Sequence, residues 1–443
     1  MMIVVFVLVA LAVLALLALV HRWLWIRLVR DTTAPGGLPR RIGTSLAIAL
    51  PLLSVAALTA GRAGAPFWLQ QAVAWPGFLW LAVLLYLTLT MLVAEPIRAL
   101  LLRRLAHRAP SEAVPAASGA PANAPASTPA SAPAAAAGNA SVAAPASVSA
   151  PAPAPAPAPA EVPAGPAVHG PSRRTLARAV GGAAAAVAVG TVANGARGVL
   201  RGPTVKRVKV PLAKLPRGAH GFRIAVVSDV HLGPVLGRAH TRRIVDAVNR
   251  TQPDVIAIVG DLVDGNVHDL GPAAEPLREL RARHGSYFVT GNHEYFSGAA
   301  QWVDHVRELG LTPLENARRS LPYFDLAGVN DIAGESEGQG PDFQAALGDR
   351  DRARAAVLLA HQPVVIHDAV RHGVDLQLSG HTHGGQLWPG NYLAELANPT
   401  VAGLERYGDT QLYVSRGAGA WGPPVRVGAP SDITVVELAS HQA

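Results

Sequence analysis

A short apolar run that ends in histidine, aspartate or asparagine is the feature that most constrains the fold of this chain. The pattern occurs five times between residues 222 and 386. Runs of four to six Val, Ile, Leu and Ala residues are typical of buried strands. In open α/β sheets, ligands bind at the edge formed by the carboxyl ends of the strands. The sequence therefore predicts an α/β domain with one polar site at that edge.

The five polar ends carry residue types that bind metal ions. In chain order they are Asp229-Val230-His231, Gly260-Asp261-Leu262-Val263-Asp264, Gly291-Asn292-His293-Glu294, His361 and Gly380-His381-Thr382-His383-Gly384-Gly385. Taken singly, an Asp or Asn here is as often a turn or helix-capping residue, and a lone His361 is more often a core histidine. Five such ends together favour a shared metal site. Alternation along an extended chain would point His381 and His383 the same way.

The types of ligand limit the choice of metal. Carboxylate, amide and imidazole groups, in a chain without cysteine, suit divalent Mn, Fe or Zn better than a thiolate-bound structural zinc. Two metal ions that share a carboxylate form a clamp for in-line attack on phosphorus. The absence of cysteine also excludes disulfides.

The order Asp-x-His, Gly-Asp-x-x-Asp, Gly-Asn-His-Glu, His and Gly-His-x-His resembles the calcineurin-like metallophosphoesterase superfamily. The longer motif Gly-His-Thr-His-Gly-Gly-Gln, with Tyr413–Gly417 and Pro424–Arg426 further on, is similar to its membrane-associated or exported phosphodiesterase-like branch. The resemblance covers about residues 205–440. It implies a four-layer αββα sandwich with a dinuclear site. The implied ligands are Asp229, His231 and His383 for the first metal, Asn292, His361 and His381 for the second, and Asp261 as the bridge.

The resemblance also implies a catalytic role for His293. This histidine would stand beside the metals without being a ligand and act as general acid towards the leaving group, while metal-activated water attacks phosphorus. Either Asp264 or Glu294 would orient it, and the sequence alone does not decide between them. Arg416 would contact the phosphate or pair with a carboxylate, and we favour the pairing.

The first hundred residues are unusually apolar. Hydrophobic residues make up 50% and charged residues 15% of the 443-residue chain, which is atypical of a wholly soluble protein. Three uncharged stretches, residues 1–20, 42–60 and 77–94, have about the length needed to span a membrane, and tryptophans lie near their edges. A cleaved signal peptide and buried core helices are the alternatives. We interpret residues 1–108 as an all-α membrane region with three transmembrane helices.

Two segments separate this region from the predicted catalytic domain, residues 205–443. Residues 109–171 are rich in Ala, Pro and Ser, which predicts a disordered linker. In residues 172–196, Arg173-Arg174 precedes an Ala- and Gly-rich stretch, as in a twin-arginine-like signal anchor. An ordinary fourth transmembrane helix is the alternative.

The net charge of +8 does not indicate nucleic acid, because many arginines flank the apolar stretches. Arginines are dense in residues 22–41 and 98–108, so the positive-inside rule places both segments in the cytoplasm. A fourth crossing then places the catalytic domain outside the cytoplasm, in a multi-pass protein of the inner membrane. The basic residues 197–209 argue against this orientation, unless they rest on anionic headgroups.

Together these features predict a membrane-tethered dinuclear-metal phosphoesterase with phosphodiesters as its expected substrates, and the sequence alone does not settle the preference between monoesters and diesters. Because the tether holds the site near the bilayer, a lipid or other envelope phosphoester is the expected substrate. The alternatives are a non-catalytic phospho-ligand-binding protein and a membrane sensor or transporter with a vestigial domain. The complete ligand set argues against the former, and the uncharged apolar stretches argue against the latter. The oligomeric state, the natural substrate and the metal identity stay open.

Overall fold

The computed structural model describes residues 2–108 and 172–442, so the predicted linker lies outside the described residues. Contacts divide the chain into two units. One comprises the residues up to Arg98 together with those from Arg174 onward, and the other is Ala99–Arg173. The first unit holds both sheets and every candidate site residue.

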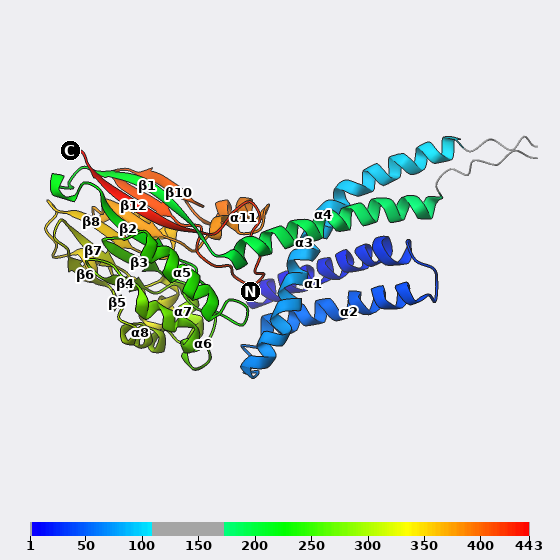
Figure 1. The fold of residues 1–443 in the computed structure, drawn as a ribbon, viewed down its shortest axis with the longest axis horizontal. Helices are drawn as coiled ribbons and strands as arrows, with labels where there is room; N and C mark the ends of the chain where they lie inside the picture. The colour runs from blue at the N-terminus through cyan, green and yellow to red at the C-terminus, as the bar shows by residue number, and fades with distance from the viewer. Residues whose placement is uncertain (1, 109–171, 443) are drawn as a thin grey trace, which may run out of the picture. The chain divides into compact units, whose positions relative to one another are not determined.

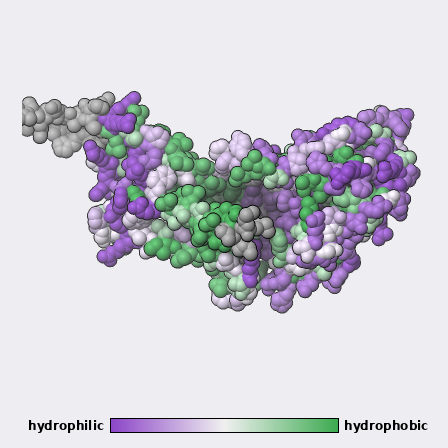
Figure 2. All heavy atoms as spheres, turned by 180° about the vertical axis from the view of Figure 1, so that it is seen from behind, coloured by the Kyte–Doolittle hydropathy of each residue, from purple (hydrophilic) through white to green (hydrophobic). Residues whose placement is uncertain are grey.

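Four long helices stand outside the sheets (Figure 1): α1 Met2–Trp25, α2 Leu38–Thr59, α3 Phe67–Arg108 and α4 Arg173–Arg201. Each contains a segment long and apolar enough to cross a membrane. A short π-helix, η1 Ile26–Arg30, follows α1. Helix α3 is longer than the expected stretch of residues 77–94 and contains Pro76 and Pro96. Figure 2 shows hydrophobic residues gathered over these helices, as membrane-spanning segments require.

Two six-stranded sheets form the other half of the unit. The first has the order β1-β12-β2-β3-β4-β5 and the second the order β10-β11-β9-β8-β7-β6. The strands of the first are β1 Thr204–Leu212, β12 Asp432–Ser440, β2 Phe222–Val227, β3 Val255–Val259, β4 Ser286–Val289 and β5 Thr312–Pro313. Those of the second are β10 Gly403–Tyr407, β11 Thr410–Val414, β9 Leu376–Ser379, β8 Ala355–Leu359, β7 Phe324–Gly328 and β6 Ala317–Ser320.

The two sheets pack face to face and helices cover their outer faces. The central core joins Val226 and Val259 of the first sheet to Val357 and Leu378 of the second. The outer helices of the first sheet are α5 Arg238–Arg250, α6 Val267–Ala274 and α8 Ala299–Glu308, and those of the second are α9 Phe343–Leu347 and α10 Ile366–Arg371. This arrangement confirms the predicted αββα sandwich. The remaining elements are α7 Asn292–Ser297, α11 Gly390–Ala397, and the 3-10 turns η2 Arg217–Ala219, η3 Glu275–Glu279, η4 Ile332–Glu337, η5 Pro363–Val365 and η6 His383–Gly385.

The apolar runs singled out in the sequence are the strands β2, β3, β4, β8 and β9. Within each sheet they pair in parallel, so their carboxyl ends lie at the same edge. The long apolar helices pack on the sandwich within the same unit. The Tyr86 hydroxyl of α3 donates a hydrogen bond to the carbonyl of Trp388 at 2.9 Å, and Phe67 packs against the cluster beneath α5 and α6.

Candidate metal centre

The chain turns sharply where it enters the site. Five residues of the predicted ligand set have left-handed backbone conformations, with φ between 50° and 73°: Asp229, His231, Asp261, His381 and His383. Such a conformation costs a residue other than glycine about 1–3 kcal/mol, and this kind of strain is concentrated at functional sites. The expectation that His381 and His383 follow an extended chain was therefore wrong. Strand β9 ends at Ser379, and His383 begins the turn η6.

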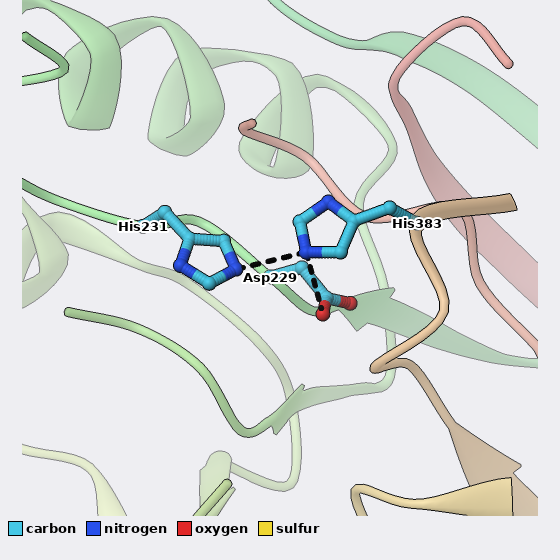
Figure 3. A group of neighbouring side chains, drawn as sticks. All are labelled: Asp229, His231 and His383. Carbon is cyan, nitrogen blue, oxygen red and sulfur yellow. Dashed lines mark hydrogen bonds and ion pairs between the residues drawn. The ribbon is translucent and has the colours of Figure 1, made fainter. Parts of the chain in front are cut away.

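One group of ligand-type side chains joins the two sheets. Asp229 and His231 follow β2, whereas His383 follows β9, and their ligand atoms lie within 4.8 Å of one another (Figure 3). The Nε2 atoms of His231 and His383 are 2.9 Å apart, and His383 Nε2 is 3.4 Å from Asp229 Oδ1. These three residues are the predicted ligands of the first metal.

A second group lies beside the first. Asp261, His361 and His381 bring their ligand atoms within 4.8 Å of one another, with His361 Nε2 3.0 Å from Asp261 Oδ2. Asn292 Oδ1 lies 3.0 Å from His381 Nδ1, so the predicted amide ligand joins this group. Asp261 Oδ2 is also 3.8 Å from His231 Nε2, which puts this carboxylate between the two groups.

The donor atoms fit divalent metal ions. His361 Nε2 is buried and faces the Asp261 carboxylate at 3.0 Å, and the imidazole nitrogens of His231 and His383 face each other. Buried polar atoms arranged in this way are costly unless they bind a cation or a proton. Oxygen and imidazole donors in a site without thiolate suit Mn, Fe or Zn.

Burial and neighbouring charges shift the acid–base properties of the site. Burial lowers the pKa of His381 to about 4, with the neighbouring His361 adding to the effect. Burial also takes the pKa of His383 well below its usual value, helped by His231 and Arg426. Both imidazoles are therefore neutral at pH 7, the form that binds metal. Burial opposes the charged form of His231 as well, but the adjacent Asp264 carboxylate outweighs it and raises the pKa of His231 to about 9.

Asp264, not Glu294, contacts the predicted general acid. Asp264 Oδ1 lies 2.7 Å from His293 Nδ1 and 2.9 Å from His231 Nδ1. The carboxylate of Glu294 instead accepts hydrogen bonds from the backbone amides of Gly291, Asp261 and Leu262, and so fixes the loops. His293 also falls in a third group of ligand-type atoms, with His231 and Asp261.

The two arginines of the C-terminal motifs differ in their contacts. Arg416 makes no ion pair within the described part of the chain, contrary to the favoured expectation, and its side chain passes close to Gly384. Arg426 is buried and donates hydrogen bonds to the carbonyls of Gly419 and His383 at 2.8 and 2.9 Å. It therefore holds η6 in place.

The site opens into a cavity of about 780 Å³. The other residues that line this cavity belong to none of the motifs named above. The rings of Phe296 and Trp421 stand 5.5 and 5.7 Å from the ring of His293, centre to centre. Leu58 and Arg62, from the end of α2 and the turn before α3, also line it. Sequence reasoning missed these four residues because no local pattern relates them to the ligand motifs at the strand ends.

Known proteins resemble this chain in sequence. The sequence model of the calcineurin-like phosphoesterase family matches residues 222–385. A "Transmembrane protein with metallophosphoesterase domain" from Danio rerio is 40% identical over 250 residues, covering 53% of this chain but only 57% of that protein. An "Uncharacterized metallophosphoesterase" from Aquifex aeolicus is 34% identical over 239 residues, which cover 91% of its length. An "Uncharacterized metallophosphoesterase YkuE" from Bacillus subtilis is 30% identical over 238 residues, covering 51% of this chain and 82% of that protein. A match over nearly the whole Aquifex protein means that this chain belongs to the calcineurin-like metallophosphoesterase family.

Proposed function

We propose that this chain is a membrane-tethered phosphodiesterase that uses two divalent metal ions. The observation that carries the proposal is the position of Asp261 between two groups of buried ligand-type side chains. One ion would be held by Asp229, His231 and His383, the other by Asn292, His361 and His381, and Asp261 would bridge them. Metal ions bound in this way polarise the phosphoryl oxygens and lower the pKa of water.

The protein's own part of the chemistry centres on His293. Asp264 accepts from His293 Nδ1, which leaves Nε2 free to give a proton to the departing oxygen. A diester of an ordinary alcohol gains from this proton because its leaving group is a poor one. Asp264 also contacts His231, so a single carboxylate positions both a proposed ligand and the proposed acid.

We further propose that the catalytic domain, residues 205–443, lies outside the cytoplasm in an inner-membrane protein. Arg27 pairs with Glu95 at 2.9 Å, and Arg178 donates to the carbonyl of Thr32 at 2.8 Å, so the arginine-rich ends of the helices gather together. The turn between α2 and α3 instead lines the cavity. The positive-inside rule puts the arginine-rich end in the cytoplasm and the cavity on the opposite side. The basic residues Arg197, Arg201, Lys206, Arg207 and Lys209, at the end of α4 and just after it, argue against this orientation, but the arginines of residues 22–41, 98–108 and 173–178 outnumber them.

The test is hydrolysis of bis-p-nitrophenyl phosphate by the full chain in detergent. The proposal predicts turnover that a chelator abolishes and that Mn²⁺ or Zn²⁺ restores. A metal-loaded protein that binds phosphate esters without hydrolysing them would instead support the phospho-ligand-binding alternative.

A further inference from the structure

We propose that α2 and α3 form part of the substrate site and that the substrate is a phosphoester with a long hydrocarbon chain. This inference rests on the proposed function, because it names the substrate class of the same site. It adds that the membrane region is a wall of the active site and that the hydrocarbon chain lies along this wall. The region is therefore more than a tether.

The two halves of the chain share one cavity. The residues that line it include His231, Asp261 and His293 of the metal centre. Leu58 of α2 and Phe67 and Phe78 of α3 form an apolar part of its wall. A phosphoester centred on the metal site therefore reaches residues of helices long enough to cross a membrane.

Contacts with the sandwich fix this wall in place. Phe67 packs against the hydrophobic cluster beneath α5 and α6. Phe78 approaches to 4.0 Å the position that a Cβ atom would take on Gly422, next to Trp421. Further along α3, the Tyr86 hydroxyl is bonded to the Trp388 carbonyl. The helices thus hold a defined position at the cavity within this unit.

Exposed apolar side chains line the cavity beside the residues of the metal centre. Phe296 and Trp421, which flank His293, are 69% and 54% exposed, and Leu58 is 48% exposed. A small soluble diester would leave these side chains in water, whereas a hydrocarbon chain would cover them. The apolar side of the cavity continues onto α2, whose outer surface carries the exposed Leu52 and Val55. An amphiphile in the bilayer would place its phosphoester at the polar metal centre and its hydrocarbon chain along these apolar side chains.

Arg62 suits the anionic end of such a substrate. It lies in the turn between α2 and α3, lines the cavity and makes no ion pair with the residues that the structure describes. A guanidinium binds phosphate oxygens through two parallel hydrogen bonds. We assign Arg62 to a phosphate or second anionic group of the headgroup.

The kinetic test compares two substrates on the full chain in nanodiscs: a p-nitrophenyl phosphodiester with a hexadecyl chain and its methyl counterpart. Leu58→Ala should lower kcat/KM for the hexadecyl ester relative to the methyl ester by roughly 3–10-fold, mainly through KM. Leu52→Ala is the matched control, since Leu52 is an exposed leucine of the same helix outside the cavity lining. It should leave the ratio unchanged. An equal ratio in wild type and Leu58→Ala would overturn the inference.

A labelling experiment supplies a readout other than activity. A hexadecyl phosphonate with a diazirine close to phosphorus should photolabel the sandwich at Phe296 or Trp421, as well as α2 and α3. Methyl phosphonate in excess should reduce the labelling at the sandwich but not the general labelling of membrane helices by lipid. Labelling confined to the helices would contradict the inference.

The two hypotheses fail in different ways. If neither ester is hydrolysed in a metal-dependent reaction, the proposed function is wrong, and photolabelling decides separately whether the cavity binds an alkyl phosphonate. If both esters are hydrolysed with metal but chain length and Leu58 have no effect, only the lipid-like substrate is wrong.

Discussion

At the scale of single residues, the proposed function depends on which side chains hold metal and which move protons. The motifs predicted the members of both groups, and the structure brings all of them to one edge of the sandwich. The motifs did not separate Asp264 from Glu294, because both are carboxylates of the motifs and their positions in the chain do not show which one faces His293. The fold decides which carboxylate contacts His293, because the Glu294 carboxylate accepts hydrogen bonds from the backbone amides of Gly291, Asp261 and Leu262.

Asp261→Asn should nearly abolish hydrolysis and reduce the metal content. An amide bridges two cations poorly, and Asp261 stands between the two ligand groups. Turnover of bis-p-nitrophenyl phosphate and metal content by mass spectrometry check this together. A variant with two metals and near-normal turnover would refute the bridge.

His293→Ala should separate chemistry from metal binding. Both metals should stay bound, while turnover falls by about 10²–10⁴ for an alkyl leaving group. The loss should be smaller for p-nitrophenolate, which leaves without needing a proton. Loss of metal from this variant would make His293 a ligand.

Asp264→Asn should change the pH dependence of stability in the metal-free protein. Asp264 raises the pKa of His231 to about 9, so the ion pair stabilises the fold fully below the unfolded value of about 6.5. That contribution disappears as the pH rises through about 9. The melting temperature of the metal-free wild type should therefore exceed that of Asp264→Asn by less at pH 9.5 than at pH 6.5. A difference that grows with pH would contradict the assignment.

At the scale of elements, the strands were predictable and the turns after them were not. Uninterrupted apolar runs predicted β3 and β8, because these strands are buried on both faces. The left-handed turns at Asp229, His231, Asp261, His381 and His383 leave no signal beyond nearby glycines. They form because the surrounding packing holds them.

Gly380→Ala should disrupt the site through one of these turns. A Cβ atom at this position would overlap Ser228 Oγ and the Asp229 carboxylate. We expect loss of metal and destabilisation by about 1–3 kcal/mol or more. Gly237→Ala is the control, since its Cβ would meet nothing within 4 Å. Unchanged metal content in Gly380→Ala would contradict the packing described here.

At the scale of the whole molecule, hydropathy predicted the long apolar helices, but not that two of them line the cavity of the candidate metal centre. The extension of α3 back to Phe67 escaped prediction because its first turns contain Gln70 and Gln71, and Pro76 interrupts the pattern. Contacts between residues more than a hundred positions apart, such as Tyr86 with Trp388, have no local sequence signature.

The proposed topology predicts the behaviour of reporter fusions. A reporter active only outside the cytoplasm should be active after Ala443 and silent when fused at Pro129. Replacing Arg173 and Arg174 with lysine keeps the charge, so an ordinary anchor should still insert, whereas a twin-arginine signal should fail. A silent C-terminal fusion in the wild-type chain would contradict this topology and place the catalytic domain in the cytoplasm.

The central claim, a two-metal phosphodiesterase, is tested most directly by titrating metal into the chelated full chain while measuring hydrolysis of bis-p-nitrophenyl phosphate. The account predicts that activity appears with metal and reaches its maximum at two ions bound per chain. Full activity at one ion per chain, or hydrolysis that persists without metal, would contradict it.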